Sequence, residues 1–221
     1  LKNQPKDNKS NETPAEQLGS IFAALPPLVE RHERAVALVE GELAKKGLVR
    51  VSPADYTDED LAAVKRLFDE RLSPIVSPLV VDPRHPFPNL RSGRLFVACS
   101  LTGPSESGLL GIVEVPTAEH RVVELPSTSK CYRYTLVEDV IRTCLGSCFG
   151  DFRPQETAVL RVTRNADIDP DGEGVEEEED YRQHMKKVLK LRQRLQPVRL
   201  ELQGSLGKKL EALVADELGL E

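Results

Sequence analysis

The stretch that decides the fold is residues 73–101, SPIVSPLVVDPRHPFPNLRSGRLFVACSL. Residues 75–81 are apolar and β-branched, but the surrounding prolines fix φ and remove amide donors, so we expect an edge strand or an extended arm. Residues 94–101 then predict a regular strand. Between them, residues 82–90 hold three prolines in nine positions. Such a loop is stiff, and stiffness lowers the entropy cost of holding side chains in place.

Cationic side chains gather on or beside this stiff loop. Arg84 and His85 lie within it, and Arg91 and Arg94 follow it directly. His85, which stands beside a proline, is either a phosphate contact or part of a structural elbow.

Outside this stretch the sequence alternates between helical and strand patterns. Apolar residues at helical spacing predict one long helix, with Gly47 at its C-cap, and several shorter helices, one of which begins after Thr57. The predicted helices cover residues 27–46, 58–72, 135–145, 175–195 and 206–218.

Short β-branched and apolar runs separated by turn-forming residues predict the strands. Residues 94–101, 109–115 and 121–125 are expected to form an antiparallel meander, and two more strands are expected over 158–163 and 198–202. The predicted fold class is therefore α+β: a largely antiparallel sheet flanked by helices and preceded by one long helix.

Charge and hydropathy exclude several functional classes. The 221 residues carry 30 basic and 36 acidic side chains, a net charge of −6. This sign argues against general nucleic-acid binding, although a local basic patch could still bind a polyanion. No apolar run approaches the roughly 20 residues of a membrane span, and residue 1 starts no signal-like pattern. We therefore expect no nucleic-acid partner, no membrane span and a cytoplasmic location.

The four cysteines predict no metal site. Cys99, Cys131, Cys144 and Cys148 fall within predicted core elements, and the paired CxxC knuckles of a zinc site are missing. We expect reduced core thiols.

An acidic loop matches a calcium-binding formula. Residues 167–178 fit D-x-D-x-D-G-x5-E position for position. A predicted strand precedes the loop, Gly174 replaces the usual aliphatic residue, and no second such loop follows. The other interpretation is an acidic start to the helix over 175–195, where the helix dipole favours negative charge.

Two arginines flank Thr163. On a strand Arg161 and Arg164 are three residues apart and so face opposite sides, unless the strand ends between them. Either could pair with the acidic run that follows, or Arg164 could face a bound phosphate, to which a guanidinium is well suited.

Two motifs carry a resemblance to a known family. PLVVDPRHPFPNL, residues 78–90, resembles the PL.VDP.HPFP.L pattern with which histidine-dependent polyphosphate kinases open their head domain. LRVTRNAD, residues 160–167, resembles the RVTRNAD signature of the same family. The resemblance covers nearly all of the chain from about residue 15.

The resemblance implies an ATP-binding phosphotransferase. Members transfer the γ-phosphate of ATP reversibly to polyphosphate, with Mg²⁺, through a phosphohistidine. The family's catalytic histidines lie in two C-terminal domains, so no catalytic residue is carried over to this chain. We expect ATP, Mg²⁺ and polyphosphate to be partners of the parent enzyme. Neither ATP nor Mg²⁺ is expected to be bound by this part alone, which should be inactive.

The resemblance also implies that the chain is incomplete. We expect a flexible arm at 1–17, the last helix of a truncated N-terminal helical domain at 18–47, and an α+β head domain at 48–221. The head domain would serve formation of a homodimer or homo-oligomer and shape the substrate passage. Its candidate contacts to polyphosphate or nucleotide phosphate are Arg84, His85, Arg91 and Arg164, and no metal ligand is assigned.

Two alternatives remain open. The chain could be a stand-alone binding or assembly module that binds calcium through residues 167–178. It could also be a diverged paralogue whose reading frame ends near Glu221.

Overall fold

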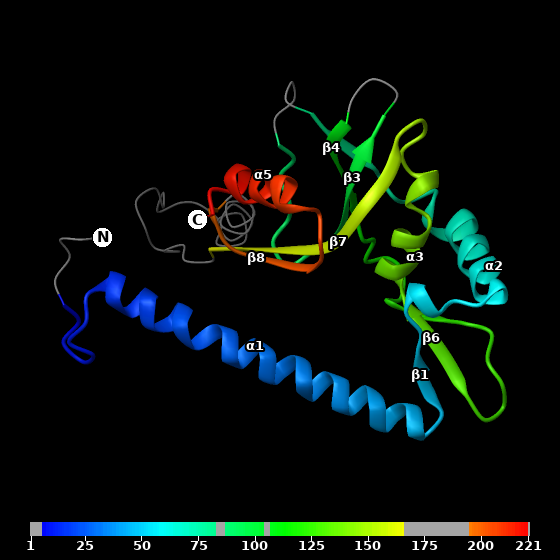
Figure 1. Ribbon diagram of the computed structural model, residues 1–221, viewed down its shortest axis with the longest axis horizontal. Coiled ribbons are helices and arrows are strands. Elements are labelled where there is room, and N and C mark those ends of the chain that lie inside the picture. The colour runs from blue at the N-terminus through cyan, green and yellow to red at the C-terminus, as the bar shows by residue number, and fades with distance from the viewer. Residues whose placement is uncertain (1–5, 83–86, 104–106, 166–194, 221) are drawn as a thin grey trace, which may run out of the picture. The chain divides into compact units, whose positions relative to one another are not determined.

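The computed structural model describes residues 6–82, 87–103, 107–165 and 195–220 (Figure 1). The chain forms two compact units. One consists of Leu1–Arg50 with Ser127–Tyr134, and the other of Val51–Pro126 with Thr135–Glu221. We call them the N-terminal unit and the sheet domain.

The N-terminal unit is dominated by helix α1 (Pro14–Lys45), whose start a capping box fixes. The Thr13 hydroxyl accepts a hydrogen bond from the Glu16 amide at 3.3 Å, and the Glu16 carboxylate accepts one from the Thr13 amide at 2.8 Å. Two amide donors that the helix cannot satisfy are thereby paired. The helix thus begins at Pro14 rather than near residue 27, and residues 14–17 are helical rather than part of an arm.

Two consecutive prolines lie inside α1 without ending it. Pro26 and Pro27 lack amide hydrogens, so the carbonyls four residues earlier have no intrahelical donor. The structure describes every residue of α1, and none of them is buried.

A glycine lies between α1 and the strand that follows it. Gly47 has φ +85°, and a Cβ there would lie 2.5 Å from the Lys130 carbonyl oxygen. Its own carbonyl accepts a hydrogen bond from the Tyr132 amide at 2.7 Å. Strand β1 (Leu48–Arg50) then pairs in parallel with the first residues of β6 (Tyr132–Leu136).

The sheet domain is built on a five-stranded antiparallel sheet of order β2-β4-β3-β7-β8. Its strands are β2 (Leu79–Val81), β3 (Leu95–Thr102), β4 (Ser107–Glu114), β7 (Arg153–Arg164) and β8 (Pro197–Gly204). The prediction from residues 73–101 is confirmed, because the proline-rich half forms the edge strand β2 and the second half forms the central strand β3.

Helices cover both faces of this sheet (Figure 1). On one face, alternate residues of β3, β4 and β7 pack against α5 (Lys208–Leu218) in a buried aliphatic cluster. The cluster contains Leu90, Phe96, Ala98, Leu110, Ile112, Ala158, Leu160, Val162, Leu206, Leu210, Val214 and Leu218. The other face carries α3 (Val137–Thr143) and the short turn η3 (Leu145–Ser147).

Helix α2 (Asp58–Leu67) begins with a second capping box. The Thr57 hydroxyl accepts from the Asp60 amide, and the Asp60 carboxylate, fully buried, accepts from the Thr57 amide at 3.0 Å. The short turn η1 (Pro53–Asp55) precedes α2, and a π turn, η2 (Phe68–Leu72), ends it.

One strand of the predicted meander is placed elsewhere. β3 and β4 pair as expected, but β5 (Val122–Glu124) belongs to a three-stranded sheet of order β1-β6-β5. Local turn signals predicted the strand but could not say which neighbour it joins. The helix predicted over 175–195 lies outside the described residues. The fold class is α+β, as predicted.

Candidate functional site

Two of the four predicted phosphate contacts lie on neighbouring segments at one end of the five-stranded sheet. Arg84 and His85 lie outside the described residues, whereas Arg91 and Arg164 are described. The loop that precedes β3 is fixed to the end of β7, because the Gly93 amide donates to the Val162 carbonyl at 2.8 Å. The Arg164 amide also donates to the Ser92 hydroxyl at 3.0 Å. The fold therefore brings together two segments that lie about 70 residues apart in sequence.

Arg164 connects this loop to the start of β8. Its Nε donates to the Leu90 carbonyl at 3.0 Å, and its Nη1 donates to the Leu195 carbonyl at 2.9 Å. Burial of the guanidinium lowers the pKa of Arg164. These two bonds give the side chain a structural role whether or not it also contacts a phosphate.

Arg91 and Arg94 share one carboxylate on β4. Arg91 Nη2 donates to Glu114 Oε1 at 2.5 Å, and Arg94 Nε lies 4.0 Å from the same oxygen. The hydrogen bond that Arg91 donates to Glu114, followed by the negative charge of Glu114, raises the pKa of Arg91. The Arg91 side chain is half exposed, so the ion pair itself contributes only about 0–1 kcal/mol.

We call Arg91, Arg94 and Arg164 the arginine corner. Two of its guanidinium groups share the Glu114 carboxylate and the third binds backbone carbonyls, so the described side chains of the corner carry excess positive charge. Each guanidinium has five N–H donors, which suits a phosphate oxygen that competes with Glu114 for Arg91. The corner can hold an anion, but none of its described side chains is a nucleophile or a general base.

Arg161 binds a different carboxylate from the one that Arg91 and Arg94 share. Its Nε and Nη2 donate to the two oxygens of Glu201 on β8, at 2.7 and 2.9 Å. This hydrogen bond is the main reason that the pKa of Glu201 is lowered. The acidic run that the sequence offered as an alternative partner lies outside the described residues.

The start of α5 is covered by the chain's own carboxylates. Glu211 Oε1 accepts from the Leu206 amide at 3.0 Å and from the Ser205 hydroxyl at 3.1 Å. A Cβ at Gly207 would lie 2.5 Å from Glu156 Oε2. Lys208 and Lys209 therefore begin a helix whose end already meets negative charge.

The cysteines are free thiols. Burial raises the pKa of Cys99 to about 12 and those of Cys144 and Cys148 to about 11. Within the described ranges, no group of three or more His, Cys, Asp or Glu side chains could hold a metal ion. Residues 167–178, which match the calcium-binding formula, lie outside the described residues.

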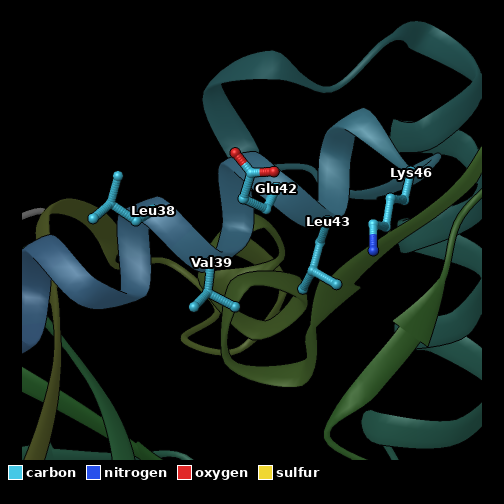
Figure 2. A pocket seen from close by; sticks show the side chains of 5 residues that line it. All are labelled: Leu38, Val39, Glu42, Leu43 and Lys46. Carbon is cyan, nitrogen blue, oxygen red and sulfur yellow. The ribbon is translucent and has the colours of Figure 1, made fainter.

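One hollow in the described part of the chain lies on α1, in the N-terminal unit. It is lined by Leu38, Val39, Glu42, Leu43 and Lys46, and Val39 and Leu43 point to the same side of the helix (Figure 2). It is shallow and apolar, and its charged groups are the ordinary surface residues of a helix.

Sequence reasoning found the arginines but missed the carboxylates that bind them. Glu114 on β4 lies 23 residues from Arg91, and Glu201 on β8 lies 40 residues from Arg161. Both carboxylates fall within predicted strands, and nothing in the local pattern says which arginine each one binds.

Among the described residues, no helix has the length and apolar character needed to cross a membrane.

Comparisons with known proteins agree with the geometry. Residues 59–221 match the family model of the polyphosphate kinase middle domain. The chain is 30% identical to a polyphosphate kinase of Lactiplantibacillus plantarum over 96% of its own length and 27% of that protein. It is 32% identical to a polyphosphate kinase of Synechocystis sp. over 99% of its length and 31% of that protein.

The fold is also that of a solved structure. The crystal structure of polyphosphate kinase from Porphyromonas gingivalis superposes with a TM-score of 0.69 at 21% identity, covering 94% of this chain and 30% of that chain. The chain thus spans about three tenths of the length of these relatives. Since the family model covers most of the chain, the protein belongs to the polyphosphate kinase family, and residues 59–221 form its middle domain.

Proposed function

We propose that this chain is the non-catalytic head portion of a polyphosphate kinase, which transfers the γ-phosphate of ATP to polyphosphate through a phosphohistidine with Mg²⁺. The observation that carries the proposal is the family match over residues 59–221. The described residues of the arginine corner include no nucleophile, which supports a non-catalytic role for it.

Within the parent enzyme, this portion shapes the substrate passage and supports assembly of a cytoplasmic homodimer or homo-oligomer. Its contribution to the passage is the arginine corner, together with Arg84 and His85 of the preceding loop. Excess positive charge on a rigid loop end attracts a polyanion, and such attraction weakens as salt screens it.

The absence of catalysis is tested by incubating the 221-residue chain with radiolabelled ATP and Mg²⁺. We expect neither polyphosphate nor a labelled phosphoprotein. Label on His85, or polymer formed by the chain alone, would contradict the proposal.

Phosphate binding is tested by titrating polyphosphate into the chain at two salt concentrations. We expect salt-sensitive binding that the double substitution Arg91→Ala and Arg94→Ala weakens about three-fold to ten-fold, the size expected for two exposed ion pairs. Arg153→Ala is the control, because Arg153 is an exposed arginine on the same sheet outside the corner. Equal binding by the double variant and the control would remove the corner from the proposed passage.

A second candidate is calcium binding, which the motif at residues 167–178 favours. Calorimetry with Ca²⁺ separates the two candidates. Tight binding that Asp167→Ala abolishes would support a calcium-dependent module, and no heat of binding would exclude it.

A further inference from the structure

The outer edge of β8 is an unpaired strand edge. β8 is the last strand in the order β2-β4-β3-β7-β8, so one of its edges pairs with β7 and the other faces away from the sheet (Figure 1). Among the described strands, none pairs with that outer edge. An edge of eight residues presents a row of backbone groups that another strand can pair with.

The two faces of β8 differ in chemistry. Leu200 and Leu202 pair with Val162 and Leu160, which lie in the core cluster, so the even-numbered positions share the apolar face that α5 covers. Val198 and Leu202 are nevertheless 56% and 38% exposed, because they stand at the rim of that face. The apolar surface of the sheet therefore continues beyond its last described strand.

The opposite face of the edge carries charge. Arg199 and Glu201 point away from α5, with Arg199 Nη2 lying 3.1 Å from Glu201 Oε1. Charged edge residues and a proline at the strand start, Pro197, oppose pairing with arbitrary strands. They permit pairing only where the partner's charges are complementary.

A second copy of this chain meets that condition in one register. Two antiparallel copies of β8 must pair residues of equal parity, because only these have matching backbone directions and faces. If the twofold axis passes through Arg199 or Glu201, two like charges face each other. If it passes through Leu200, Arg199 of each copy lies opposite Glu201 of the other, and Val198 lies opposite Leu202.

We propose that two copies of the chain associate by antiparallel pairing of their β8 edges, with Leu200 on the twofold axis. The sheets of the two copies become one continuous sheet, and the rims formed by Val198 and Leu202 cover each other. This deepens the assembly role proposed above and rests on it, since it names the surface through which that role is performed. A twofold arrangement makes every contact occur twice, which is why a self-complementary strand is sufficient.

The charge pattern allows a test by charge exchange. Arg199→Glu places two carboxylates on each edge, and Glu201→Arg places two guanidinium groups there. In either variant like charges then face each other across the axis. The two edges are complementary only when one variant is mixed with the other.

The experiment is sedimentation equilibrium of the 221-residue chain from about 1 µM to about 1 mM, because a contact of one strand per copy lies at the weak end of protein interfaces. We expect the unmodified chain to dimerise, each variant to lose at least ten-fold in self-association, and an equimolar mixture to recover a one-to-one complex. Arg153→Glu and Glu124→Arg are the matched controls, because both side chains are exposed on other strands and neither should alter association.

Folding is checked separately, because Glu201 also binds Arg161. Thermal unfolding of both variants must match that of their controls, and the recovery by mixing cannot be produced by misfolded chains. Dimers that persist in Arg199→Glu would overturn the β8 interface while leaving the assembly role intact. An unmodified chain that stays monomeric throughout the range would overturn both.

Discussion

Helix α1 and strand β3 are both rich in apolar residues, yet one is exposed and the other is buried. In α1, all of which is described, no residue is buried, and Leu38 is 71% exposed. In β3, residues 96–99 are all buried. Local signals such as capping boxes define helices in both units, but only the sheet domain adds the packing that usually supplies most stability. The same substitution should therefore have different effects in the two regions.

Truncating a leucine should separate the regions most strongly. Leu160 is fully buried in the core cluster, so Leu160→Ala should lower the free energy of unfolding of the sheet domain by about 2–5 kcal/mol. Leu38→Ala should change it by less than about 0.5 kcal/mol. Urea unfolding followed by circular dichroism measures both, and equal midpoints for the two variants would contradict the contrast.

Adding a methyl group should have opposite signs in the two regions. A Cβ at Gly111 would lie 2.8 Å from Phe149 Cζ and 2.9 Å from Cys99 Sγ, so Gly111→Ala should destabilise by about 1–3 kcal/mol. At Gly41 in α1 nothing lies within 4 Å, and Gly41→Ala should stabilise the helix by roughly 0.5–1 kcal/mol. Thermal unfolding and the helical signal report the two signs, and a neutral Gly111→Ala would show that the contact relaxes freely.

Removing a helix cap should change stability by less, and the loss should be larger for α2 than for α1. Thr57→Ala takes a hydrogen bond from the buried Asp60 carboxylate and should lower stability by about 1–2 kcal/mol. Thr13→Ala acts on the exposed Glu16 and should mainly fray the first turn of α1, at about 0.5 kcal/mol. Urea unfolding measures the global loss, and hydrogen exchange at the first turns of α2 and α1 measures local fraying. If Thr57→Ala only frayed the first turn of α2 and left global stability unchanged, the expected difference between the two caps would be contradicted.

The sheet domain should lose stability as pH rises, through Tyr56, and α1 should lose helicity as pH falls, through Glu16. Near neutral pH these two changes in stability should be the smallest of the predicted effects. Burial raises the pKa of Tyr56 to about 12 from an ordinary value of about 10, although its 2.5 Å hydrogen bond with Thr135 opposes the shift. A raised pKa means that the folded state favours the neutral phenol, so this stability is present below pH 10 and is lost as pH rises toward 12. Tyr56→Phe should flatten the alkaline part of a plot of unfolding free energy against pH, and an unchanged slope would assign the loss to other groups.

In α1 the capping carboxylate should respond to acid. The Thr13 amide and hydroxyl lower the pKa of Glu16, so its contribution is present above the ordinary pKa and is lost as pH falls through the lowered value. Helical signal lost on acidification should be smaller in Glu16→Gln. A variant that titrates like the unmodified chain would show that the box does not act through the charge.

Much of the sheet domain could be predicted from sequence because its signals are local. The prolines around residues 75–81 indicated the edge strand β2, and the apolar run over 94–101 indicated the central strand β3. Gly47 lies just beyond the end of α1, as its conformational freedom suggested. The predicted start of this helix, residue 27, was wrong, because the prediction gave Pro26 and Pro27 more weight than the T-P-A-E capping sequence at residues 13–16.

What could not be predicted is the choice of partner for a strand or a side chain. The pairing of β5 with β6 rather than β4 is a choice among neighbours that turn residues do not encode. The bonds from Arg164 to the carbonyls of Leu90 and Leu195 join segments 74 and 31 residues away, and backbone acceptors leave no trace in the side-chain pattern. The sequence therefore pointed to Arg91 and Arg164 as candidate phosphate contacts, but it could not predict which groups of the protein they bind.

The way the N-terminal unit takes residues from two separate stretches of chain has a practical consequence for dissecting the protein. A polypeptide begun at residue 51 would lose β1 but retain Ser127–Tyr134, whose first β6 residues pair with β1. Without β1, the first residues of β6 would have an unpaired strand edge, which proteases could cleave. Excising the sheet domain therefore calls for a new amino terminus and a short turn between Pro126 and Thr135, and it leaves β5 beside only the last two residues of β6.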